Sequence, residues 1–135
     1  MKRLLGVALL AIVVAGGLSC GDSTGPKGPG TLQIRLTSPA ANSGADSAIV
    51  LAITGPAPLT SVTAGAGLRL FSQPLTGTTT RFAITGPLIN GATILTIGVA
   101  DIGAFSQYTG TVQGVATPTY QLRPILSGYA LAVIR

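Results

Sequence analysis

The segment from Thr31 to Thr37 alternates between apolar and polar side chains without a break. Leu32, Ile34 and Leu36 would point to one face of an extended chain, and the residues between them to the other. This period of two is typical of a β-strand with one buried face. The rest of the chain after residue 30 contains no clean apolar stripe at helical spacing, so we expect the folded part to be all-β.

Other short segments with strand-forming composition follow, separated by Gly, Pro and Asn turn residues. The predicted strands after the first are 47–54, 61–63, 68–71, 79–85, 92–99, 107–113, 119–122 and 129–134. So many short strands at this spacing indicate a sandwich or a barrel, and we expect an antiparallel β-sandwich of about 7–9 strands over residues 31–135. In 47–54, Val50 stands between two alanines opposite the main apolar face, so both faces of that strand are expected to be covered.

One four-residue sequence occurs twice, as Ile-Thr-Gly-Pro at 53–56 and again at 84–87. Proline cannot donate a hydrogen bond to a neighbouring strand, so each copy is expected to end a strand. Duplication of half of the sandwich would also give such a repeated sequence. Because the flanking sequences do not recur, we favour two independent strand ends.

The composition is poor in the side chains that perform chemistry. The chain has no His and no Glu, only three acidic residues, and charged residues make up 8% of it. A Ser-His-Asp or Cys-His arrangement is therefore impossible, and the usual zinc sites lack their ligands. An enzyme would need Asp46 and Asp101 to converge in a cleft. We therefore expect a non-enzymatic protein with no catalytic residues, metal site or cofactor.

Residues 1–19 have the layout of a secretory signal peptide. Lys2 and Arg3 are followed by an uncharged, apolar stretch from Leu4 to Leu18. This stretch contains glycines and is shorter than the roughly 20 residues of a membrane-spanning helix. The sequence predicts export.

The single cysteine, Cys20, lies directly after this segment, between Ser19 and Gly21. Here the chain resembles the lipobox of bacterial lipoproteins, although Gly17 stands where that family usually has Leu. The resemblance implies a signal-peptide helix, lipidation of Cys20, and an anchor in the cell envelope, at the outer membrane or cell surface. Ordinary cleavage after Ser19 is the alternative and would give a secreted protein.

Residues 20–30 consist of this cysteine and a flexible Gly/Pro/Ser tether, because the residues after Cys20 are small, polar and interrupted by Pro and Gly. The opening Cys-Gly-Asp-Ser-Thr-Gly-Pro is similar to that of small bacterial lipoproteins with a β-rich domain, a resemblance that implies no particular activity. The segments 48–51, 61–65 and 91–97 faintly resemble cohesin-type or immunoglobulin-like sandwiches, and cohesin-type domains are binding modules.

Two functions remain open on this basis. The first is a membrane-anchored, non-enzymatic sandwich that binds a protein or carbohydrate or serves the envelope structurally. The second is a secreted, cohesin-like adhesion or carbohydrate-binding module with a face formed by Tyr108, Tyr120 and Tyr129. That face requires at least two exposed tyrosines. After residue 19 the chain has six basic and three acidic residues. The basic residues are dispersed along the sequence and form no cluster, which disfavours nucleic acid as a partner.

Overall fold

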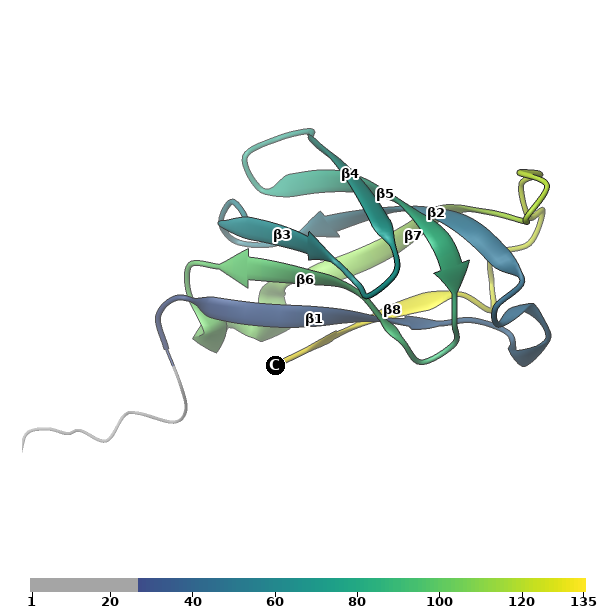
Figure 1. Cartoon of the computed structure of the whole chain (residues 1–135). Helices are drawn as coiled ribbons and strands as arrows, with labels where there is room; N and C mark the ends of the chain where they lie inside the picture. The colour runs from purple at the N-terminus through teal and green to yellow at the C-terminus, as the bar shows by residue number, and fades with distance from the viewer. Residues whose placement is uncertain (1–26) are drawn as a thin grey trace, which may run out of the picture.

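The computed structural model describes residues 27–135, which form a sandwich of two four-stranded antiparallel sheets (Figure 1). The predicted signal peptide, Cys20 and most of the tether lie outside the described residues. One sheet has the order β3-β6-β1-β8 and the other β4-β5-β2-β7. The strands are β1 Gly30–Thr37, β2 Asp46–Thr54, β3 Ser61–Ala64, β4 Arg69–Pro74, β5 Thr79–Leu88, β6 Thr93–Val99, β7 Thr109–Ala116 and β8 Ala130–Ile134. The predicted sandwich is confirmed.

The alternating side chains of the central strands form the core between the sheets. Leu32, Ile34 and Leu36 of β1 are buried, as their spacing predicts. From the opposite sheet, β2 and β5 contribute Leu51 and Phe82, which face each other in register. No helix among residues 27–135 is long and apolar enough to cross a membrane.

The predicted strand at 119–122 is wrong. Only Leu122 makes a β-bridge, to Ala116, and the segment is a turn in the connection between β7 and β8. The Thr117 amide donates to the Gln121 carbonyl at 3.0 Å, which folds the chain back on itself. Tyr120 has a φ of 63°, which is incompatible with a strand.

The two Ile-Thr-Gly-Pro copies behave differently. The first ends β2 at Thr54, as predicted, but β5 continues through Gly86 and Pro87 to Leu88. Pairing of β2 with β5 shifts register here, since Ala48 opposes Thr85 and Asp46 opposes Leu88. A register shift tolerates proline because its missing N–H is not needed in the ladder.

The expectation that both faces of β2 are covered is confirmed in part, because on the outer face Ala52 is buried and Ala48 and Val50 are half-buried. No third layer lies on its outer face within residues 27–135. Neighbouring side chains shield part of that face instead, because Arg81 Nε on β5 donates to Gln113 Oε1 on β7 at 3.1 Å. Ala52, on the strand between them, is buried.

Candidate functional site

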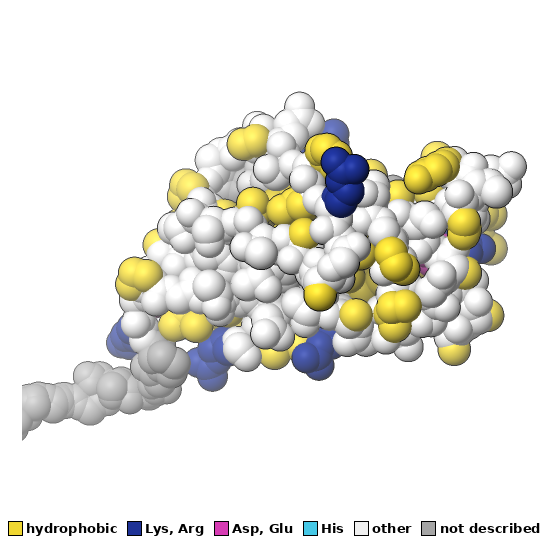
Figure 2. Space-filling model, viewed as in Figure 1, with side chains coloured by type: hydrophobic (Ala, Val, Ile, Leu, Met, Phe, Trp, Pro, Cys, Tyr) yellow, Lys and Arg dark blue, Asp and Glu magenta, His cyan; other side chains and the backbone are white. Residues whose placement is uncertain are grey.

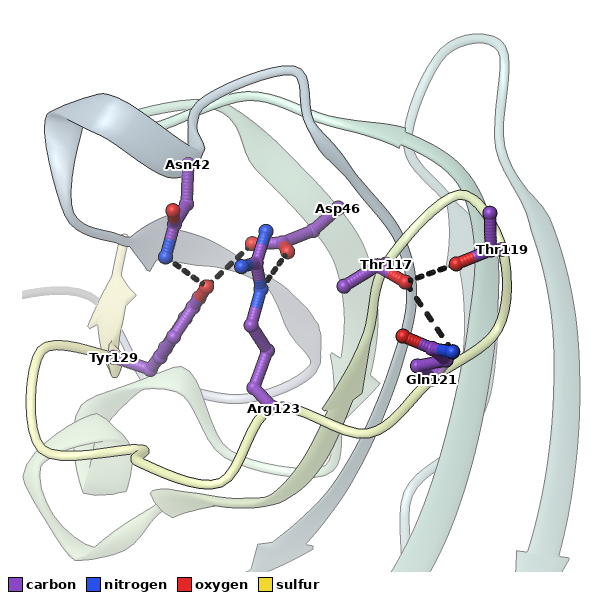
Figure 3. A network of polar contacts seen from close by, with 7 residues as sticks. All are labelled: Asn42, Asp46, Thr117, Thr119, Gln121, Arg123 and Tyr129. Carbon is purple, nitrogen blue, oxygen red and sulfur yellow. Dashed lines mark hydrogen bonds and ion pairs between the residues drawn. The ribbon is translucent and has the colours of Figure 1, made fainter.

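A buried polar network lies at the end of the sandwich where β2 begins (Figure 3). Asp46 is only 1% exposed, and its carboxylate accepts hydrogen bonds from two side chains. Arg123 Nε donates to Oδ1 at 2.7 Å, and the Tyr129 hydroxyl donates to Oδ2 at 2.5 Å. Asn42 Nδ2 donates to the same hydroxyl at 2.9 Å. The network therefore joins β2 to the connection between β7 and β8.

The pKa values of two members of the network, Arg123 and Tyr129, are raised. The hydrogen bond to Asp46 raises the pKa of Arg123, so the guanidinium remains charged. Burial, followed by the hydrogen bond to Asp46, raises the pKa of Tyr129 above its ordinary value of 10.0. At neutral pH the arrangement is an ion pair with a neutral tyrosine as second donor. Such groups are suited to holding a loop in place.

Alkaline pH should weaken the fold because of these raised values. Burial also raises the pKa of Tyr108, with the Asp101 charge as a second cause. A folded state that holds these protons more tightly than the unfolded chain is fully stabilised below pH ~10 and loses that stabilisation as the pH rises further. Urea unfolding between pH 8 and 11 should show a falling free energy of unfolding above pH ~10. In the Tyr129→Phe variant, the free energy of unfolding should fall less steeply with pH, because one of the titrating hydroxyls is gone. A free energy that rises with pH in this range would contradict the assignment.

The connection held by Arg123 exposes three large apolar side chains, Tyr120, Leu122 and Ile125. Its shape is fixed by the Thr117 turn, where the hydroxyl accepts from the Gln121 amide at 3.2 Å and also contacts the Thr119 hydroxyl (Figure 3). Exposed apolar side chains gathered on one segment commonly mark a contact surface. We refer to residues 117–128 as the apolar loop.

A cleft of about 490 Å³ lies beside Tyr120 of the apolar loop. Arg69 of β4 and Thr85 of β5 oppose each other in register and both line it. The remaining lining residues are Gly44, Ser47, Gly67, Gly86 and Pro87. Of the six residues with positive φ in the described chain, four line this cleft: Gly44, Gly67, Gly86 and Tyr120. Turns from several parts of the sequence thus meet around one hollow.

A second hollow, of about 350 Å³, lies between residues of β3 and β4 and the turns next to them. Its lining consists of apolar, hydroxyl-bearing and glycine residues, and it includes no charged side chain: Pro58, Leu59, Thr60, Ser61, Val62, Ser72, Pro74, Thr76, Gly77 and Thr80. This second hollow is lined by hydroxyl groups but by no aromatic ring and no charged side chain. The cleft beside Tyr120 is therefore the better candidate site.

The predicted tyrosine face is not present. Tyr108 is 3% exposed and packs against Gly55, where an added Cβ would lie 2.2 Å from its ring. Tyr129 is 8% exposed and belongs to the buried network. Only Tyr120, at 72% exposure, is available to a partner. The expected face of at least two exposed tyrosines is thus corrected to one exposed ring beside a cleft.

The structure does not bring Asp46 and Asp101 together. Asp101 precedes the 3₁₀-helix η2, Ile102–Gln107, and its Oδ1 accepts from the Gly103 amide at 2.9 Å and the Gly28 amide at 3.0 Å. It therefore lies where β1 begins, at the end of the sandwich opposite the connection between β7 and β8 (Figure 1). Within residues 27–135 no three His, Cys, Asp or Glu side chains cluster as metal ligands would.

Sequence reasoning missed the structural partnership of Asp46 with Arg123 and the position of Arg69. One signal was present, since Asp46 directly precedes the predicted strand at 47–54, which is mainly small and apolar, in a chain with very few acids. A buried acid in such a position needs a cation or several donors. Which arginine supplies the charge depends on the loop fold and cannot be read from the spacing.

Comparisons with known proteins give no relative from which a role could be transferred. The chain matches no protein-family model, no curated protein and no solved structure. Any function of the chain must therefore be inferred from its own residues.

Proposed function

We propose that this chain is an exported lipoprotein, anchored through acylated Cys20, whose β-sandwich acts by contact with another envelope component. The observation that carries this proposal is the sequence from Met1 to Gly21: a basic start, an apolar stretch, and the only cysteine directly behind it. Acyl chains contribute about 0.8 kcal/mol per buried CH₂, so two or three chains give a firm anchor without a spanning helix.

The arrangement of the described residues is compatible with such an anchor. Gly28 is fixed by hydrogen bonds to Asp101 and Ile102 at the end of the sandwich where β1 begins. The apolar loop, whose Tyr120 lines the cleft, lies near the other end (Figure 1). A lipid attached at Cys20 would thus be joined to the end remote from the candidate site, which leaves that site free for a partner.

Contact is a better-supported role than catalysis. The chain has no His or Glu, Asp46 is occupied by Arg123 and Tyr129, and Asp101 is bonded to two backbone amides. General acid–base chemistry normally draws on these residue types with a free, positioned group. A nucleic-acid role has little support, since the Lys and Arg side chains stand apart on the face drawn in Figure 2.

Metabolic labelling with palmitate tests the anchor. The wild-type chain and a Ser23→Ala control should incorporate the label and sediment with membranes, because Ser23 lies outside the proposed lipidation signal. Cys20→Ala should incorporate none, since the acceptor thiol is gone, and should leave the membrane fraction once its signal peptide is cleaved. A wild-type protein without label would refute the proposal and favour the secreted alternative.

A further inference from the structure

We propose that the cleft between Tyr120 and Arg69 binds a carboxylated sugar unit of an acidic polysaccharide. In this arrangement the Tyr120 ring covers the apolar face of the sugar, Arg69 pairs with its carboxylate, and the hydroxyls of Ser47 and Thr85 meet its hydroxyl groups. This assignment deepens the proposed contact function by naming a ligand class for the same end of the domain.

The charge of the cleft points to an anion. Arg69 lines it, is exposed, and has no ion-pair partner among residues 27–135. No acidic residue lines the cleft. Both acids of the described chain are used elsewhere, Asp46 in the buried network and Asp101 at the opposite end. A guanidinium left without a partner presents a planar fork of N–H donors that suits a carboxylate.

Tyr120 provides an aromatic ring on an ordered backbone segment beside this charge. Its φ of 63° lies in the left-handed region, which is disfavoured for a side chain of this size. The conformation is held by its own amide, which donates to the Thr117 carbonyl at 2.7 Å, and by the Arg123 amide, which donates to the Val115 carbonyl at 2.8 Å. The Arg123–Asp46 ion pair ties the same segment to the start of β2. A loop backbone that is already ordered loses little entropy when a ligand binds to it.

The rest of the lining suits a polyhydroxylated ligand. Gly44, Gly67 and Gly86 line the cleft with positive φ and no side chain, so little more than backbone borders it at these positions. A Cβ built on Gly67 would meet nothing within 4 Å, which shows that its backbone borders open space. Hydroxyls, backbone groups, one aromatic ring and one charge form the combination expected of a pocket that orients a small polar ligand. The volume of about 490 Å³ lies within the range of such pockets.

The test measures binding of the full mature protein, extracted in detergent, to immobilised polygalacturonate. Fully methyl-esterified polygalacturonate is the matched ligand control, because it keeps the sugar rings and removes the charge. Arg35→Ala is the matched protein control: it removes one exposed arginine from β1 in the other sheet. Tyr120→Asn removes the ring with a residue that tolerates left-handed φ, so the fold should survive.

Wild-type protein should bind the carboxylated polymer and bind the ester at least about tenfold more weakly, since the ester cannot pair with a guanidinium. Arg69→Ala and Tyr120→Asn should each weaken binding about tenfold, whereas Arg35→Ala should change it by less than about twofold. Thermal unfolding of each variant checks that it is folded.

Three results would overturn the assignment: no wild-type binding to the carboxylated polymer, equal binding to both polymers, or equal losses for Arg35→Ala and Arg69→Ala. The last would mean attraction by net charge alone. Binding to vesicles of anionic lipid in place of the polymer would assign the apolar loop to a membrane and would also overturn it. Palmitate labelling of Cys20 does not depend on the cleft, so failure here and failure of the lipid anchor are distinguishable.

Discussion

Replacement of Phe82 by alanine should lower the free energy of unfolding by about 4 kcal/mol, the largest single effect that we expect in this domain. Phe82 has no exposed surface and lies on β5, opposite Leu51 of β2. Its removal takes a full aromatic ring out of the contact between the two sheets. Because neighbouring strands are held by their ladders, the space can collapse only in part, and a cavity term adds to the lost burial.

Phe71→Ala is the matched control for this prediction. Phe71 lies on β4, next to β5, but its side chain is 57% exposed on the outer surface. Its loss should change the free energy of unfolding by no more than about 1 kcal/mol, because the ring is only partly removed from water. Urea unfolding at neutral pH measures both variants. Equal losses for Phe71→Ala and Phe82→Ala would contradict the placement of the core between these sheets.

Asp46→Ala should lower the free energy of unfolding by about 3 kcal/mol, because it leaves a half-buried guanidinium and a buried hydroxyl without their acceptor. Arg123 would lose the carboxylate 2.7 Å from its Nε, and Tyr129 would retain only the donor from Asn42. The effect should extend beyond stability, since the same carboxylate holds the apolar loop. Amide hydrogen exchange of residues 117–128 should accelerate in this variant, and urea unfolding gives the free energy.

Asp101→Ala is the control with the same change of charge. Asp101 is exposed and accepts from the amides of Gly28 and Gly103, so its loss removes a cap from η2 and should cost about 1 kcal/mol. Exchange in residues 117–128 should stay at the wild-type rate in Asp101→Ala. If Asp46→Ala costs no more than Asp101→Ala, the buried network does not hold this end of the sandwich.

Local pattern predicted the fold well where one strand face is buried. The alternation at 31–37 predicts β1 within one residue, because one face of this strand is fully buried and its side chains alternate at the strand period. The segment 119–122 was predicted wrongly because it has no such buried face. Its threonine, tyrosine and leucine favour a strand by propensity, but Thr117 turns the chain back, so no ladder can form beyond one bridge.

The candidate site could be predicted only in part, because it is assembled from distant segments. The sequence pointed to three tyrosines, and burial leaves Tyr120 alone as an exposed ring. Arg69 lies 51 positions before Tyr120, and nothing local relates the two. Their shared cleft depends on how the connection between β7 and β8 folds toward the β4–β5 side, which the Asp46–Arg123 ion pair helps to fix.

The intact mass of the mature protein, isolated from cell envelopes, tests the proposed function most directly. The lipoprotein assignment predicts a mass above that of residues 20–135 by a lipid group with two or three acyl chains, with the added mass on the fragment that carries Cys20. The unmodified mass of residues 20–135, or a chain that still begins at Met1, would contradict it.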